Sequence, residues 1–175
     1  MTAIDIAKRI VATNPREIGR NTDNGGIIDR VQRELGLSPG NPWCAAFVSH
    51  CFREAGAGSA FPYSASSQYI KKWFEDRGLL SRDPQDLLKW TGAIAGWTNQ
   101  PDTSHGHIFL VAGRGTTTLG GVQRVINIKS FEGNTNSQGG RDGDGAYARI
   151  RQVPVDNDHR LWFCNTGSIP GGQWW

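Results

Sequence analysis

The residue best suited to chemistry is Cys44, in the run Asn41-Pro42-Trp43-Cys44-Ala45-Ala46-Phe47-Val48. Asparagine favours the N-cap of a helix and proline its first turn, so we predict a helix with Asn41 as N-cap and Cys44 at the third helical position. Unpaired backbone N–H groups and the helix dipole at that end favour a negative charge, which lowers the pKa of a thiol. Because the thiolate is the nucleophilic form of cysteine, this segment indicates acyl-transfer chemistry.

A nucleophilic cysteine needs a base, and the base needs a group that orients it. His107 is the preferred base because it begins an apolar run typical of a strand, which would hold the ring at the edge of a cleft. His50 lies six residues after Cys44 on the same predicted helix, so its side chain points elsewhere. His105 and His159 fall in predicted loops.

Glu132 and Asn134 are the candidates for the orienting group. They are two residues apart on a predicted strand, so they should share a face that offers a carboxylate and an amide. The carboxylate would hydrogen-bond the imidazole and favour its charged form, which in turn stabilises a thiolate. The residues alone leave two interpretations open: a Cys–His pair, or cysteines with structural roles only.

Helical periodicity dominates the first half of the chain and strand patterns the second half. Helices are predicted over residues 3–11, 26–35, 41–55 and 66–76, with a further turn over 84–88. Strands are predicted over residues 93–97, 107–112, 122–128, 130–134, 147–153 and 160–164. Helices followed by strands predict an α+β fold with a mainly antiparallel sheet. At 175 residues, the chain is expected to form one domain over residues 1–175.

Composition excludes several classes of protein. The net charge of +3 comes without a cluster of Lys and Arg, so no nucleic-acid partner is expected. No apolar run reaches membrane-spanning length, and the N-terminus lacks the pattern of a secretory signal, so synthesis in the cytoplasm without a signal peptide is expected. Cys44 and Cys51 are too far apart on one helix for a disulfide, and Cys51 and Cys164 are expected to be buried.

Three motifs occur in a fixed order: Pro42-Trp43-Cys44-Ala45-Ala46-Phe47-Val48, then Gly106-His107-Ile108, then Glu132-Gly133-Asn134-Thr135-Asn136. Together they resemble the CHAP family of peptidoglycan hydrolases, within the papain-like, NlpC-type cysteine peptidase superfamily, over about residues 17–151. The resemblance implies a papain-like fold with N-terminal helices packed on a mainly antiparallel β-sheet. It implies Cys44 as nucleophile, His107 as general base and then acid, Glu132 as its orienting group and Asn134 as the residue that completes the site. One departure is Gly92-Ala93-Ile94, where the family often has Gly-Asp-Ile.

The resemblance implies hydrolysis of an amide bond in peptidoglycan, by an N-acetylmuramoyl-L-alanine amidase or a peptide endopeptidase. Two biological settings fit: a phage endolysin, or an antibacterial effector that is injected and has an immunity protein as partner. In both, the protein acts on the cell wall or in the periplasm after release or injection, and a monomer is expected. The alternative from another class is a catalytically silent module that binds the wall or a protein on the same fold.

No metal or cofactor is predicted. The run Asp142-Gly143-Asp144-Gly145 lacks the remaining ligands of an EF-hand loop. No Cys or His near Cys44 has the spacing of a zinc site. Residues 21–24 could supply oxygen ligands, and some relatives of the CHAP family bind calcium in an early loop, so calcium stays open.

Overall fold

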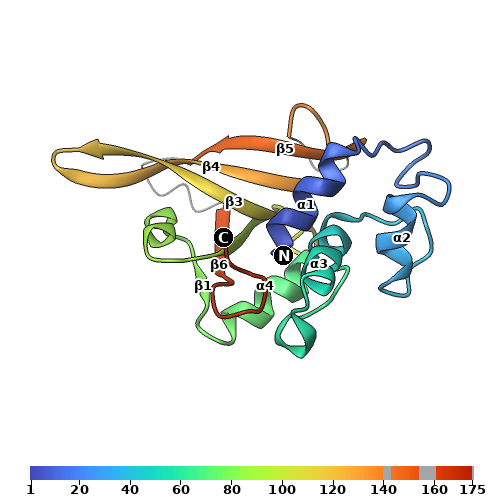
Figure 1. The fold of residues 1–175 in the computed structure, drawn as a ribbon, viewed down its shortest axis with the longest axis horizontal. Helices are drawn as coiled ribbons and strands as arrows, with labels where there is room; N and C mark the ends of the chain where they lie inside the picture. Colours follow the sequence, from blue (N-terminus) through green and yellow to red (C-terminus); the bar gives the residue numbers. More distant parts are fainter. Residues whose placement is uncertain (140–142, 154–160, 175) are drawn as a thin grey trace.

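The computed structural model describes residues 1–139, 143–153 and 161–174. The first half of the chain contains four α-helices, and the second half contains most of the strands (Figure 1). The helices are α1 (Ala3–Ala12), α2 (Ile27–Arg33), α3 (Cys44–Glu54) and α4 (Ser67–Glu75), with short 3-10 helices η1 (Gly58–Ala60) and η2 (Pro84–Leu88). The strands are β1 (Leu80–Ser81), β2 (Ala93–Thr98), β3 (Gly106–Leu119), β4 (Val122–Thr135), β5 (Gly145–Gln152) and β6 (Leu161–Asn165). His159, Arg160 and Asp142 lie outside the described residues.

The strands form a six-stranded sheet in the order β1-β6-β2-β3-β4-β5, and every neighbouring pair is antiparallel. α1 packs against β3, β4 and β5, while α3 packs against β3 and β4. Figure 1 shows α1 lying across the broad part of the sheet, with the β3–β4 hairpin extending well beyond the helices. The predicted α+β class with a mainly antiparallel sheet is confirmed.

A hydrophobic core lies on each face of the sheet. The helices cover one face, where Phe47 and Val48 of α3 meet Ile108 and Leu110 of β3. On the other face, alternate residues of the same strands form a second core under η2; it includes Phe109. Strand alternation explains this division, because successive side chains point to opposite faces. β3 is therefore buried on both faces near its N-terminal end, which fixes the position of the residues that begin it.

The start of α3 differs from the prediction. Trp43 is the N-cap residue and Cys44 is the first helical residue, so the predicted N-cap Asn41 was wrong by two positions. The indole N–H of Trp43 donates to Glu17 Oε1 at 3.0 Å, and the Asn41 amide donates instead to the Ser38 carbonyl at 2.8 Å. The Trp43–Glu17 contact joins segments that are distant in the sequence, so local helix propensity does not predict where the helix starts. Cys44 nevertheless stays among the unpaired N–H groups of the first turn.

The hairpin of β3 and β4 is longer than predicted. The strands predicted over residues 122–128 and 130–134 form one strand, and β3 continues beyond residue 112. Glycines at 113 and 115 lie at shifts in the β3–β4 register, where bulges let the strand continue. Gly120 and Gly121 both have positive φ, as a two-residue hairpin turn requires. The two-residue strand β1 was not predicted.

Candidate active site

Cys44 lies where β3 and β4 separate. The β3–β4 register ends at the pair Leu110–Phe131, and beyond it β3 keeps its pairing with β2 only. α3, which packs against both strands, begins at this point, and the backbone N–H of Ile108 on β3 faces the Cys44 thiol. The separation of two strands therefore makes room for the N-terminus of the helix and supplies the thiol with a donor.

The surroundings of Cys44 favour its thiolate. Burial by itself raises the pKa of the thiol, but the hydrogen bond and positive charge of His107 and the backbone N–H groups of Ile108 and Ala45 outweigh it. The net result is a pKa below the usual value for cysteine. Cys51, on the same helix, has no such neighbours, and burial raises its pKa well above the usual range. The pKa values of the two thiols thus shift in opposite directions because of their positions on one helix.

His107 is fully buried at the start of β3 and is held on two sides. Its Nε2 lies 3.0 Å from Glu132 Oε2, and its ring centroid lies 4.6 Å from that of Trp97. Nε2 contacts the carboxylate, and Nδ1 is buried without a hydrogen-bond partner among the described residues, so Nδ1 is the nitrogen available to the neighbouring thiol. Burial lowers the pKa of the imidazole, but Cys44 and Glu132 together raise it above the usual value. A thiolate beside an imidazolium is the form that these contacts favour.

Glu132 is a fully buried carboxylate with three kinds of partner. It accepts from His107, from the Ser130 hydroxyl at 2.5 Å and from the Arg151 guanidinium at 2.7 and 2.6 Å. Burial raises its pKa, but the contacts with His107 and Arg151 outweigh this effect and lower the pKa to about 2. Glu132 is therefore ionised throughout the physiological range and orients the imidazole from the side opposite the thiol.

The backbone at Asn134 departs from the regular strand that the sequence predicts. Its φ of 54° is left-handed, and the β4–β5 register shifts between Glu132 and Thr135. The regular alternation that would place Asn134 on the same face as Glu132 is therefore interrupted. The amide of Asn134 is buried, and within the described residues neither its oxygen nor its nitrogen has a hydrogen-bond partner. The structure thus brings together Cys44, His107 and Glu132, whereas the side-chain amide of Asn134 makes no hydrogen bond to them.

A cleft of about 270 Å³ opens next to the thiol. Cys44 is 5% exposed and forms part of the cleft wall, whereas His107 lies behind it with no exposed surface. The rest of the wall comes from the segments before α3, before and at the start of α4, and before and at the start of β3. These residues are Leu37, Asn41, Pro42, Ala65, Ser66, Ser67, Ser104, His105 and Gly106. Small and hydroxyl-bearing side chains dominate, so the cleft offers hydrogen-bonding groups beside the Cys44 thiol.

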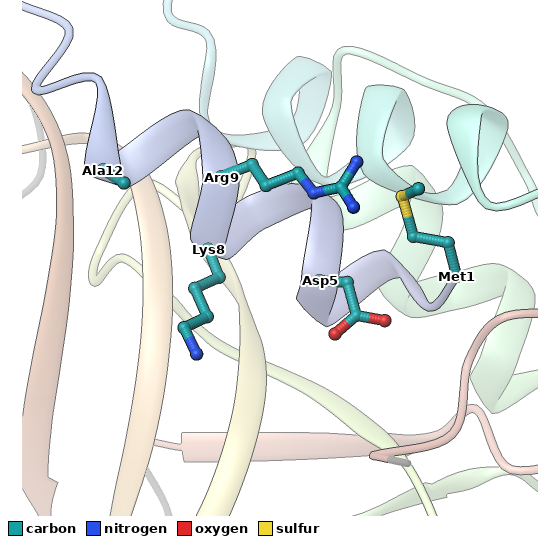
Figure 2. Close-up of a pocket in the computed structure, with 5 residues that line it drawn as sticks. All are labelled: Met1, Asp5, Lys8, Arg9 and Ala12. Carbon is teal, nitrogen blue, oxygen red and sulfur yellow. The ribbon is translucent and has the colours of Figure 1, made fainter.

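A larger hollow of about 580 Å³ lies along α1, and Figure 2 shows the side chains that line it. Lys8 and Arg9 extend from the helix in different directions, and Asp5 is already engaged by the N-terminal cap residue Thr2. None of its lining residues is a nucleophile with a base beside it. The smaller cleft at Cys44 is therefore the candidate active site, because chemistry rather than size distinguishes the two.

Two groups of residues contain side chains of the types that bind metal ions. Glu34, His50 and Glu54 place ligand atoms within 4.8 Å of one another. However, Arg30 contacts both carboxylates and Arg53 contacts Glu34, so positive charge is already present there. His50 Nδ1 lies 2.7 Å from Glu34, pointing away from the Cys44 site as predicted. The group is therefore an ion-pair network rather than a metal-binding site.

In the early loop that contains residues 21–24, and at the start of α2, the carboxylates accept hydrogen bonds from nearby backbone N–H groups. Asp23 accepts from the N–H groups of Ile28 and Asp29, at the start of α2. Asp29 accepts from the Thr22 hydroxyl at 2.6 Å and from the N–H groups of Asp23 and Gly25. These hydrogen bonds cap the N-terminus of α2 and hold the loop before it in place, so they account for the acidic residues there without a metal ion.

Two residues of the site were missed in the sequence. Arg151, near the end of β5, contacts Glu132, and Trp97, near the end of β2, packs against His107. Trp97 packs against the second core and also contacts His107. No local pattern marks Arg151, since its role arises from the β4–β5 register. The sequence predicts a strand over residues 147–153 that contains Arg151, but it does not predict which strand lies beside it.

Comparison with known proteins gives one partial match. A family model described as an uncharacterized protein conserved in bacteria (DUF2272) matches residues 10–82. This part of the chain is similar to that family. It includes Cys44 but ends before His107 and Glu132, and it spans less than half of the sequence. No curated protein and no solved structure matches the chain. Within the described residues, no helix combines the length and apolar character needed to cross a bilayer.

Proposed function

We propose that this protein hydrolyses an amide bond of bacterial peptidoglycan, as a cysteine-dependent amidase or endopeptidase with Cys44 as nucleophile. One observation carries the proposal. The thiol at the first residue of α3 interacts with the His107 imidazole, whose Nε2 is 3.0 Å from the buried carboxylate of Glu132, and the thiol borders a cleft. Nucleophile, base and orienting group in this order are the requirements for covalent acyl transfer.

The proposed reaction has two halves. In the first, the Cys44 thiolate attacks the amide carbonyl, and the backbone N–H of Cys44 stabilises the tetrahedral oxyanion at the helix start. The His107 imidazolium gives its proton to the leaving amine, and a thioester remains. In the second half, neutral His107 takes a proton from water, the resulting hydroxide attacks the thioester, and the acid product leaves. Glu132 stays ionised throughout and keeps the imidazole in place.

Peptidoglycan is proposed as substrate on two grounds. The three motifs around Cys44, His107 and Glu132 resemble those of CHAP-family peptidoglycan hydrolases. The cleft wall is also suited to a peptide with small side chains, since it offers hydroxyl groups and a glycine next to the thiol. Cleavage of the bond between the glycan and the stem peptide and cleavage within the peptide are both consistent with this wall. The proposed setting is the cell wall, reached on phage lysis or on injection.

The test is the set of muropeptides released from purified peptidoglycan of defined chemistry, separated by liquid chromatography and identified by mass spectrometry. Cys44→Ala should release nothing above background while keeping the circular dichroism of the parent protein. Cys51→Ala is the matched control, because Cys51 is fully buried on the same helix and has no base beside it. That variant should retain the parent's products.

The products also separate the alternatives. A free stem peptide indicates an amidase, and a cut cross-link indicates an endopeptidase. Products from Cys44→Ala equal to those of the parent would remove Cys44 from the chemistry. A parent protein that binds the wall but releases no product from any defined peptidoglycan would favour the silent binding module.

A further inference from the structure

Arg151 lies behind the site, on β5, with its guanidinium aimed at Glu132. Nε lies 2.7 Å from Oε1 and Nη2 lies 2.6 Å from Oε2, so both carboxylate oxygens are bound by one planar group. Nη2 also donates to the Gly139 carbonyl at 3.1 Å. Two parallel contacts of this kind fix the orientation of a carboxylate as well as its charge.

Aromatic rings hold the guanidinium in this position. Its central carbon lies 5.0 Å from the ring centroids of both Trp97 and Phe109. Trp97 in turn packs against His107, and the side chain of Arg151 is only 18% exposed. Arg151 is therefore confined between the carboxylate and the aromatic layer beneath the imidazole, and its side chain has little freedom to leave.

We propose that Arg151 is a positioning residue that acts through Glu132: it fixes the carboxylate against His107 and completes a row of alternating charges that ends at Cys44. The proposal rests on the proposed function, since it assigns a role in the same site. Arg151 touches neither the thiol nor the cleft wall, so its effect on the reaction passes through Glu132 and His107.

The alternation of charge gives the physical reason. Thiolate, imidazolium, carboxylate and guanidinium carry −, +, − and + in sequence, so the buried group is neutral as a whole. Among the described residues, the charged groups that face Glu132 are His107 from β3 and Arg151 from β5, and the one that faces the Cys44 thiol is His107. Removal of the guanidinium would leave one net negative charge in a buried site. Uptake of a proton would restore neutrality, at the cost of the thiolate.

The test is the rate of Cys44 alkylation by iodoacetamide as a function of pH, followed by mass spectrometry of the intact protein and of its Cys44 peptide. In Arg151→Gln, the midpoint of the profile should move to higher pH by roughly one unit, the size of effect expected for a lost opposite charge. Arg151→Lys keeps the charge and should keep a midpoint near that of the parent. Because an ammonium group contacts the Glu132 carboxylate at one point rather than two, Arg151→Lys should still hydrolyse the wall more slowly than the parent.

Arg149→Gln is the matched control. Arg149 is two residues away on the same strand, but it donates to the carbonyls of Asn136 and Ser137 rather than to Glu132. Its substitution should leave the midpoint unchanged. A parent-like midpoint in Arg151→Gln, or an equal shift in Arg149→Gln, would overturn the inference. If Arg151→Gln does not fold, the test uses Arg151→Lys. An Arg151→Lys variant with the same midpoint and the same hydrolysis rate as the parent would also overturn the inference.

Alkylation requires no peptidoglycan, so the two proposals fail separately. A protein that cuts no wall but shows the shift in Arg151→Gln leaves the role of Arg151 intact. A protein that cuts the wall through Cys44 but shows no shift leaves the proposed function intact and removes Arg151 from the site.

Discussion

Substitution of Glu132 by glutamine should remove a large pH-dependent contribution to stability. The carboxylate is fully buried, and burial raises its pKa, yet His107 and Arg151 bring it from about 4.5 down to about 2. A depression of this size corresponds to roughly 3 kcal/mol. Because the pKa is lower in the folded state than in the unfolded state, this stability is present above about pH 4.5 and is lost as the pH falls toward about 2.

The assay is urea unfolding of the parent and of Glu132→Gln, followed by tryptophan fluorescence at steps between pH 6 and pH 2. The parent should be the more stable protein near pH 5. The difference in free energy of unfolding should then shrink with decreasing pH, by at most about 1.4 kcal/mol per pH unit and roughly 3 kcal/mol in total. Other carboxylates are common to both proteins and largely cancel in the difference. A difference that stays constant below pH 5, or that grows, would refute this account of Glu132.

Further predictions concern the elements that hold the site. Gly133→Ala would place a Cβ 2.6 Å from the Trp43 ring and 2.7 Å from Phe47 Cβ, so it should cost about 1–3 kcal/mol in urea unfolding. Gly113→Ala, where a Cβ meets nothing within 4 Å, is its control and should change stability by less than about 0.5 kcal/mol. Ser66→Ala removes the N-cap hydrogen bond of α4 and should cost about 1 kcal/mol in the same assay. A Gly133→Ala variant as stable as Gly113→Ala would contradict the close packing of β4 on α3.

Local sequence patterns predicted those parts of the fold that local interactions determine. Ser66 was expected to begin a helix, and it caps α4. The start of α3 was misplaced because Trp43 is anchored by Glu17, which lies 26 positions earlier in the chain. The strand predicted over residues 107–112 continues into a long hairpin, where shifts in register lie beside Gly113 and Gly115. Long-range contacts and bulges leave no local signature, so the errors fall at these places.

The site divides in the same way. Cys44, His107 and Glu132 stand out because a helix start, a strand start and a strand interior are recognisable from the sequence. Arg151 does not, since only the register of β5 against β4 brings it to Glu132. Asn134 was placed beside Glu132 on the assumption of a regular strand, and its left-handed backbone breaks that regularity.

The central claim is that His107 keeps Cys44 ionised, and the pH dependence of Cys44 alkylation tests it most directly. Cys51 and Cys164 are fully buried, and burial raises the pKa of both thiols, so labelling of the native protein should report on Cys44. Half-maximal alkylation of the parent should occur below the usual cysteine value of about 8.5, and His107→Ala should move it to higher pH. His50→Gln, a histidine of α3 outside the site, should leave it in place. A parent profile centred at or above about pH 8.5, or one unchanged in His107→Ala, would contradict the account.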